Sequence, residues 1–274
     1  MGILVSDISI IIPVKDNQSG INRLLKSFFE TQNENNFPKE IIIVDNLSRN
    51  EVYIQNEFKD IELKIHVIKC ERIGPAAARN LGAKIAKGKW LFFTDSDCIF
   101  TETSLTGFSE IKICASAYAG NVSPSENTYL SRYYKQLNLL VPLEHPRNPK
   151  QPWYIVTANC LVNKEDFDAV EGFDESFHLA SGEDVDLGFR LWSADKEIIY
   201  ALQAKILHQY ENKLSKFYKR FIRYGKGHAL LEHKHGINLA PEKIKVNKKN
   251  LINKLLAIVH YSGLKKGYNT IYRD

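Results

Sequence analysis

Two carboxylates follow a run of strand-forming apolar residues in the segment LFFTDSDCIF, residues 91–100. Asp95 and Asp97 stand two positions apart, where the apolar run stops. On one short loop these carboxylates repel each other unless a cation compensates them. Ligation by carboxylate oxygens suits Mg²⁺ or Mn²⁺, which usually keep water ligands and also bind substrate phosphates. The spacing therefore predicts a divalent metal, Mn²⁺ or Mg²⁺, together with a phosphate-bearing ligand.

Further acidic residues stand at the ends of other predicted strands. Apolar runs predict strands over 8–14, 40–44, 65–69 and 90–94, and apolar periodicity predicts helices over 21–31 and 75–87. Asp16 and Asp45 follow the first two of these strands. Because parallel strands covered by helices bind ligands at their carboxyl ends, a functional edge is expected there. A single acid after a strand is usually a turn or cap residue, but several in succession favour function.

Two common phosphate-binding motifs are absent from the sequence. No GxGxxG follows the first strand, and no GxxxxGK[ST] occurs anywhere. Neither a dinucleotide site nor a P-loop is therefore expected. The phosphates are expected to meet the metal instead.

Length and composition limit the class of protein. The chain has 274 residues, of which 44% are hydrophobic, enough for one large globular domain with a tail or for two small domains. No apolar run reaches the roughly 20 residues of a spanning helix, and no signal-like segment opens the chain, so a cytoplasmic protein is expected. The four cysteines lack CxxC spacing and are expected to be reduced core thiols. They are Cys70, Cys98, Cys114 and Cys160.

Positive charge is concentrated in the tail. Residues 211–274 carry 15 basic and 4 acidic side chains, net +11, whereas residues 1–210 carry 22 and 28, net −6. Residues 213–226 form a predicted basic amphipathic helix. Its apolar face could pack on the rest of the protein and leave a solvated basic face, or the helix could bind an anionic membrane surface or acceptor. Nucleic acid is not an expected partner, because RNP-like aromatic motifs are absent.

An ordered set of motifs resembles the GT-A type, family 2 glycosyltransferases over roughly residues 8–228. The matching stretches are IIPV at 11–14, IIVDN at 42–46, GPAAARNLG at 74–82, FTDSD at 93–97, EGFDE at 171–175, GEDVDL at 182–187 and His208. The resemblance implies an α/β GT-A (Rossmann-like) fold, with a mostly parallel sheet flanked by helices and a basic helical C-terminal extension. Residues 1–210 would form the catalytic domain, with a nucleotide-sugar half at about 1–100 and an acceptor half at about 101–210. Residues 211–274 would form the extension.

The resemblance also implies an activity. Such enzymes transfer a sugar with inversion from a nucleotide diphosphate sugar, most often a UDP-sugar, to an acceptor hydroxyl, with the help of a divalent metal. A role in polysaccharide or glycoconjugate biosynthesis is implied, with a glycan, a lipid-linked molecule or a peptide as acceptor. The protein would be cytoplasmic and could lie peripherally on the membrane.

The resemblance assigns several residues to the nucleotide end, with Asp95 toward the ribose. Asp45 would accept a hydrogen bond from the base, and the loop with Pro13, Val14 and Asp16 would border that base. Arg79 matches an arginine of the nucleotide pocket, where a fixed cationic fork suits phosphate oxygens. A buried partner for an Asp is an equally good role for Arg79 from the sequence alone.

The metal would lie between this end and the donor sugar. Asp97 corresponds to the direct metal ligand, and Asp95 to the ribose or water-mediated partner. His208 matches a histidine that completes the metal shell in many relatives, and its neutral imidazole is acceptable to Mn²⁺. Asn159 falls where relatives place a segment beside the donor sugar.

The chemistry needs one more group, a base for the acceptor proton. Glu183 and Asp184 are the candidate pair, and in the family pattern Asp184 is the base. In an alternative interpretation, Ser181–Asp184 form a capping box and Asp184 serves only the helix expected over 184–193. Both roles could coexist, since amides at a helix start hold a carboxylate.

Some positions depart from the family pattern. Lys15 and Asp16 stand where relatives often have Tyr and Asn, and Leu47 replaces a common Gly, so the base and sugar stay open. Residues 120–154 carry no motif, and acceptor loops are expected there. Two other classes of function stay open as well. One is a metal-dependent nucleotidyltransferase or phosphatase, and the other a non-catalytic module that binds membrane or nucleic acid.

Overall fold

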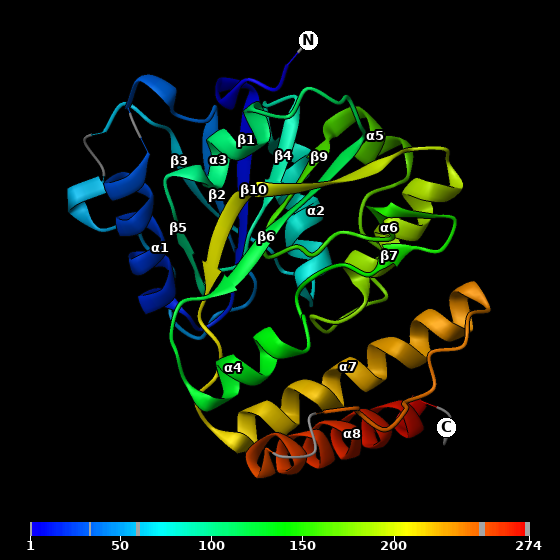
Figure 1. Cartoon of the computed structure of the whole chain (residues 1–274). Coiled ribbons are helices and arrows are strands. Elements are labelled where there is room, and N and C mark those ends of the chain that lie inside the picture. Colours follow the sequence, from blue (N-terminus) through cyan, green and yellow to red (C-terminus); the bar gives the residue numbers. More distant parts are fainter. Residues whose placement is uncertain (1, 33, 59–60, 247–249, 272–274) are drawn as a thin grey trace.

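The computed structural model describes residues 2–32, 34–58, 61–246 and 250–271. Its centre is an eight-stranded sheet in the order β3-β2-β1-β4-β9-β6-β10-β5 (Figure 1). The strands are β1 Ile8–Val14, β2 Glu40–Asp45, β3 Ile65–Lys69, β4 Trp90–Phe93, β5 Cys98–Phe100, β6 Ala117–Pro124, β9 Cys160–Asn163 and β10 Ile198–His208. A separate hairpin is formed by β7 Glu144–His145 and β8 Asn148–Pro152. The large sheet runs through both halves that the sequence predicted within residues 1–210.

Strand direction gathers the predicted acids at one edge. β2 and β4 both pair in parallel with β1, and β3 pairs in parallel with β2. β9 is antiparallel to both β4 and β6, so β6 runs the same way as β4, and β10 is parallel to β6. The carboxyl ends of β1, β2, β4 and β10 therefore lie along the same edge. The predicted α/β architecture with a mostly parallel sheet is confirmed.

Helices α1 and α3 cover one face of the sheet, and α2, α5 and α6 cover the other. The described helices are α1 Gln18–Thr31, α2 Pro75–Ile85, α3 Thr103–Ser109, α4 Tyr129–Gln136, α5 Lys164–Ala169, α6 Glu183–Ser193, α7 Leu214–His235 and α8 Leu251–Ile271, with 3-10 turns at Val5–Asp7, Glu34–Asn36 and Asn56–Phe58. Successive strand residues point to opposite faces. Ile10 and Ile12 thus join one core with α1 and α3, while Ile11 joins a second core with α2, α5 and α6. Burial on both faces explains the continuous apolar runs over 10–14 in β1 and over 41–44 in β2.

The C-terminal extension is a helix pair, α7 and α8, that lies beside the carboxyl edge of the sheet (Figure 1). Phe217 and Phe221 of α7 form a third core with Tyr133 and Tyr134 of α4 and with Leu256 of α8. The helix predicted over 213–226 corresponds to α7, which is longer than expected and ends at His235. Residues 247–249 and 272–274 of the predicted extension lie outside the described residues.

Glycines let α7 and α8 approach closely. A Cβ added at Gly267 would stand 1.8 Å from the carbonyl oxygen of Ile222, and one at Gly225 would stand 2.1 Å from that of Leu264. Backbone atoms cannot move aside as a flexible side chain could. Glycine is therefore required at these positions, because even the Cβ of alanine would collide with the backbone of the other helix.

None of the described helices is both long enough and apolar enough to cross a membrane.

Gly267→Ala tests the close contact of α7 and α8. At an unhindered helix position this change would raise the free energy of unfolding by about 1 kcal/mol. The Ile222 carbonyl reverses the sign, and we expect a loss of about 1–3 kcal/mol, as is typical of overpacking, in urea unfolding. Ser262→Ala, at an exposed position of the same helix, is the control and should be neutral or slightly stabilising. A stabilised Gly267→Ala protein would show that the helices do not meet there.

Candidate active site

A cavity of about 760 Å³ opens at the carboxyl edge of the sheet. The ends of β1, β4 and β10 contribute Val14, Asp95 and His208 to its lining, and α6 contributes Asp184. Helix α7 of the extension supplies a further wall. A volume of this size is typical of sites for small molecules and cofactors.

Asp95, Asp97 and His208 converge as the sequence predicted. Each of the three offers one ligand atom, and these atoms lie within 4.8 Å of one another. Nε2 of His208 is 3.4 Å from Oδ1 of Asp97. Two carboxylates and an imidazole form a donor set that suits Mn²⁺ and is acceptable to Mg²⁺. The residues present thus fit the predicted divalent metal.

Strand pairing brings His208 to the acidic loop. β5 begins directly after Asp97 and pairs antiparallel with β10, with Cys98 opposite His208. The amide of Gln209 also donates to the carbonyl oxygen of Asp97 at 2.9 Å. The backbone therefore holds the imidazole against the carboxylates. His208 is 3% exposed, so its position is set by the core.

Arg79 links two carboxylates from distant parts of the chain. Nη2 is 2.7 Å from Oδ1 of Asp95, and Nη1 is 2.8 Å from Oε1 of Glu183. Burial disfavours the charge of this guanidinium, but Asp95 and Glu183 outweigh it and hold the pKa of Arg79 above its ordinary value. The side chain is 2% exposed and also lines the cavity. Partnership with an Asp, one of the two predicted roles, is therefore present.

Glu183 and Asp184 open α6 but differ in their surroundings. Glu183 is buried against Arg79, whereas Oδ2 of Asp184 accepts a hydrogen bond from the Thr157 amide at 3.4 Å. The N-cap of α6 is Gly182, at φ 94°, and no side chain caps this helix start. The alternative interpretation of Ser181–Asp184 as a capping box is therefore wrong.

The environment of Asp184 favours the protonated carboxyl. Burial and, next, the negative charge of Glu183 raise the pKa of Asp184 to about 7. The Arg79 guanidinium and the amides of Val185 and Thr157 oppose this shift. A carboxylate with a pKa near the working pH can accept a proton from a bound hydroxyl efficiently. The predicted role of Asp184 as a general base stays a prediction, with which this pKa is compatible.

The predicted nucleotide residues gather at the ends of β1 and β2, where Val14 and Asp45 are register partners. Pro13 and Val14 line the cavity. Asp45 accepts a hydrogen bond from the Ser48 amide at 3.0 Å. Asp16 accepts one from the Arg49 amide at 2.9 Å, and chiefly this bond lowers the pKa of its carboxyl.

Among the described residues, Asp16 and Asp45 are not part of the cavity lining. They brace the two strand-end loops beside it. Their predicted contact with the nucleotide base stays a prediction.

Leu47, which departs from the family pattern, has an unusual backbone conformation. Its φ is 62°, in the left-handed region that favours glycine. Relatives often have Gly at this position, and the backbone conformation that Gly suits is kept here by a leucine.

Asn46 is a lining residue to which the sequence analysis gave no role. Its Oδ1 accepts a hydrogen bond from the Gly74 amide at 3.0 Å, and its Nδ2 donates to the Arg72 carbonyl at 2.6 Å. These bonds hold the turn that leads into α2 and Arg79. The position of Asn46 directly after Asp45, at the end of a predicted strand, was the feature of the sequence that could have indicated a role at this site.

Asn159 is fully buried between two strands. Its Nδ2 donates to the carbonyl oxygens of Asn121 at 3.0 Å and Ala204 at 2.8 Å. Among the described residues it is not part of the cavity lining, whereas its neighbours Thr157 and Ala158 are. Its predicted place beside the donor sugar stays a prediction.

One interpretation of the sequence gave this helix a solvated basic face. In the structure, two arginines of that face contact the protein. Arg220 is largely buried, and its Nε donates to Oε2 of Glu211 at 3.0 Å. Nε of Arg223 donates to the carbonyl oxygen of Ala180 at 3.0 Å. Arg220, Arg223, Tyr224 and His228 all line the cavity. Their spacing of three and four residues in the sequence indicates that they share one face of a helix, but it does not show what that face contacts.

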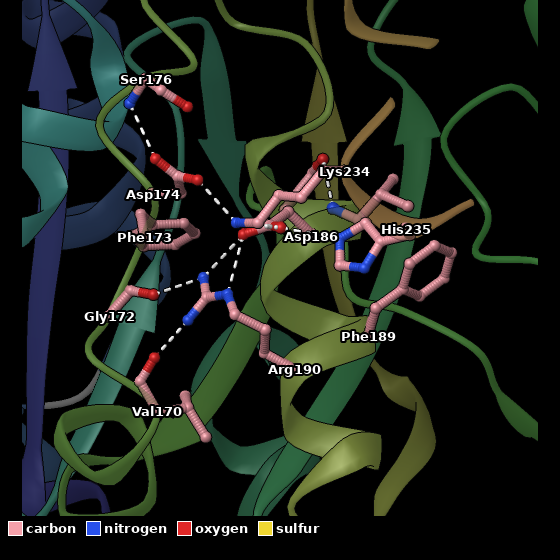
Figure 2. A network of polar contacts seen from close by, with 12 residues as sticks. Val170, Gly172, Phe173, Asp174, Ser176, Asp186, Phe189, Arg190, Lys234 and His235 are labelled. Carbon is pink, nitrogen blue, oxygen red and sulfur yellow. Dashed lines mark hydrogen bonds and ion pairs between the residues drawn. The ribbon is translucent and has the colours of Figure 1, made fainter. Parts of the chain in front are cut away.

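A buried ionic cluster fastens α6 to α7 (Figure 2). Asp186 of α6 is fully buried, and its carboxylate contacts Lys234 at 2.7 Å, His235 at 2.8 Å and Arg190 at 2.8 Å. Lys234 also reaches Asp174 at 2.6 Å. The cluster thus fixes the extension against the helix that carries Glu183 and Asp184.

Comparison with protein families gives a match to the one described as "Glycosyl transferase family 2" over residues 9–165. The pre-mycofactocin glycosyltransferase of Mycobacterium tuberculosis (strain ATCC 25618 / H37Rv) is 30% identical over 244 residues, 86% of this chain and 49% of the relative. The chain thus spans about half the length of this curated relative. A putative polypeptide N-acetylgalactosaminyltransferase 10 of Caenorhabditis briggsae is 23% identical, over 77% of this chain and 37% of its own.

Solved structures share the fold. The mannosyltransferase PcManGT from Pyrobaculum calidifontis, in complex with GDP-Man and Mn²⁺, has a TM-score of 0.61 at 13% identity, covering 97% of this chain and 74% of its own. GalNAc-T7 with UDP, GalNAc and Mn²⁺ has a TM-score of 0.57 at 14% identity, covering 75% and 43%. At these identities the likeness concerns the fold alone.

The raised pKa of Asp184 predicts a pH-dependent effect of Asp184→Asn on stability. Between about pH 4 and 7 the folded protein keeps a proton that the unfolded chain loses, so the stability contribution of this carboxyl falls as pH rises. Asparagine cannot ionise. We therefore expect the variant to gain stability relative to wild type between about pH 5 and 8 in urea unfolding.

Asp168→Asn is the control, because its carboxylate is 58% exposed and far less constrained. It should show no comparable gain. The free energy of unfolding of Asp184→Asn, relative to wild type, should differ between about pH 5 and about pH 8. If this difference from wild type were the same at both pH values, the raised pKa of Asp184 would be contradicted.

Proposed function

The chain belongs to glycosyl transferase family 2, and we propose that it transfers a sugar from a UDP-sugar to an acceptor hydroxyl with inversion at the anomeric carbon. One observation carries this proposal. Asp184 presents a carboxyl to the cavity that also holds the Asp95, Asp97 and His208 group, and burial together with the negative charge of Glu183 raises the pKa of this carboxyl to about 7. Family membership favours this reaction over nucleotidyl transfer or phosphate hydrolysis.

Asp95, Asp97 and His208 would hold the metal, with Mn²⁺ or Mg²⁺ as candidates. Bound there, the ion would offset the charge that builds on the departing diphosphate. Two solved neighbours of the same fold were crystallised with a nucleotide and Mn²⁺, which supports this assignment. Pro13, Val14, Asp16 and Asp45 would form the base end, on the adjacent strand ends β1 and β2.

Asp184 would act as the base. It would take the proton of the acceptor hydroxyl while that oxygen bonds to the anomeric carbon, and the bond from this carbon to the diphosphate oxygen breaks. Glu183 would serve as a positioning residue through its ion pair with Arg79. The Thr157 and Val185 amides hold the Asp184 carboxylate in place for this step.

Two variants separate donor binding from transfer. In a thermal-shift panel of UDP-, GDP- and dTDP-sugars, we expect a UDP-sugar to raise the Tm only when Mn²⁺ is present. Asp97→Asn should abolish this shift. Asp184→Asn should keep it, yet release UDP from the donor on the order of 10²- to 10⁴-fold more slowly, since it lacks a useful base.

Each variant is the control of the other. An undiminished Mn²⁺-dependent shift in Asp97→Asn would remove this residue from the metal site. UDP release within about threefold of wild type in Asp184→Asn would assign the base elsewhere. A shift with a GDP-sugar alone would overturn the proposed uridine.

The extension supports the further proposal of peripheral attachment to an anionic membrane surface. Four apolar side chains in the first half of α8 are exposed, at 76% for Leu251, 57% for Ile252, 56% for Leu255 and 65% for Ile258. Exposed lysines accompany them on this helix pair, at Lys216, Lys219, Lys254, Lys265 and Lys266. An apolar stripe next to lysines complements a surface of acidic lipid.

Vesicle sedimentation tests this attachment. We expect acidic vesicles of phosphatidylglycerol and phosphatidylcholine to retain the protein at low salt and to release it at high salt. The double variant Leu255→Ser, Ile258→Ser should lose most of this retention. Leu202→Ser, which changes a leucine of β10 that is 59% exposed, is the control. If acidic vesicles do not retain the wild type at low salt, the attachment is wrong.

A further inference from the structure

The two sides of the active-site cavity differ in chemistry. Asp95, Asp97, Arg79, Glu183 and His208 make one side ionic. The other, apolar side comes from residues that flank the β7–β8 hairpin, from α6, and from the last turns of α7 with the segment after it, beyond Arg220, Arg223 and His228 of the same helix. Its main residues are Leu143, Trp153, Phe189, Leu231 and Leu239.

Backbone and ring contacts hold this apolar side in place. The Trp153 amide donates to the carbonyl oxygen of Leu143 at 2.7 Å. The rings of Trp153 and Phe189 lie 4.6 Å apart at 35°. The Leu239 amide donates to the Glu232 carboxylate at 2.8 Å, which fixes the chain after α7. The apolar side is thus a built surface that spans three parts of the fold.

Two leucines at this cavity stay open to water. Leu143 is 62% exposed and Leu179 is 44% exposed, although both line the cavity. Large apolar side chains gain when a ligand removes them from water. Their position beside the reacting groups, rather than elsewhere on the surface, points to a ligand of the same cavity.

Asp184 is connected to residues of both sides. It follows Glu183 at the start of the helix that carries Phe189, and it accepts a hydrogen bond from the amide of Thr157, four residues after Trp153. The donor diphosphate would occupy the ionic side, beside the Asp95, Asp97 and His208 group. An acceptor whose hydroxyl reaches Asp184 can then extend over the apolar side.

We propose that this apolar side is a subsite for an alkyl chain, and that the acceptor is an amphiphile whose hydroxyl-bearing head lies at Asp184. The inference rests on the proposed function, because it assigns the acceptor of that reaction. Sugar hydroxyls packed against these leucines would lose hydrogen bonds to water without replacing them. An alkyl chain loses none and gains affinity with each buried methylene, up to about fourfold per group.

Binding of matched glucosides tests the subsite without requiring the correct donor. The probes are methyl, phenyl and octyl β-D-glucoside, the last below its critical micelle concentration, titrated by calorimetry into the full chain. We expect the octyl glucoside to bind at least tenfold more tightly than the methyl glucoside, and more tightly than the phenyl one. The double variant Leu143→Ser, Leu179→Ser should weaken octyl binding threefold to tenfold and leave methyl binding unchanged.

Leu202→Ser is the matched control, as an exposed leucine outside this lining. Equal binding of octyl and methyl glucosides would overturn the subsite, and so would equal weakening by the control and the double variant. A phenyl glucoside that binds as tightly as the octyl one would replace the chain with a flat aromatic group and overturn the proposal. Both mutated leucines are exposed, so we expect folding to be unaffected, which the melting temperature checks.

The donor thermal shift, measured on the same preparation, separates the two proposals. A Mn²⁺-dependent shift with a UDP-sugar but without a preference for octyl glucoside would leave the transferase intact and sink the subsite. Octyl preference without any donor shift would sink the proposed function and leave an apolar binding site.

Discussion

The buried guanidinium of Arg79 is the interaction on which the candidate site depends. It contacts Asp95 after β4 and Glu183 at the start of α6, and it is 2% exposed. Removal of one partner from a buried ion pair leaves an uncompensated charge, which is strongly destabilising. Without Arg79, Asp95 and Glu183 would lose the cation that they share.

The same ion pair makes two neighbouring carboxylates unlike. Arg79 donates to Glu183 directly, whereas burial and, next, the negative charge of Glu183 raise the pKa of Asp184 against the weaker, opposing effect of the guanidinium. One acid is thereby held as part of the structure, and the next is left with a pKa near 7. Two carboxylates whose environments differ in this way can take different roles in one reaction.

The C-terminal helices complete the cavity instead of forming an independent tail. Helix α7 turns Arg220, Arg223, Tyr224 and His228 toward the cavity, while Phe217 and Phe221 pack on α4 and α8. The Asp186 cluster fastens one end of α7 to α6, and glycine contacts along the helix pack α7 closely against α8. The wall that α7 contributes to the cavity is thus tied to the same helix that carries Asp184. A shift of the extension would change both together.

Local pattern in the sequence was sufficient for the elements and for the edge of the sheet. The strands over 8–14 and 65–69 have the predicted bounds, because alternation and apolar runs reflect the burial of each residue against its own faces. The carboxylates at Asp95 and Asp97 could be placed at a ligand-binding edge for the same reason. Cap and end residues were less certain, as Gly182 shows, because they depend on which neighbour supplies the hydrogen bond.

Contacts between distant segments were decided only by the tertiary structure. Arg79 and Glu183 are 104 residues apart in the chain, and His208 reaches Asp97 only because β5 pairs with β10. The pKa of Asp184 and the inward direction of Arg220 likewise depend on partners from other elements. A sequence pattern records how each segment is buried. Which buried groups meet is set by the order and direction of the strands and by the packing of helices on them, and the free energy of a charge in the core depends on that meeting.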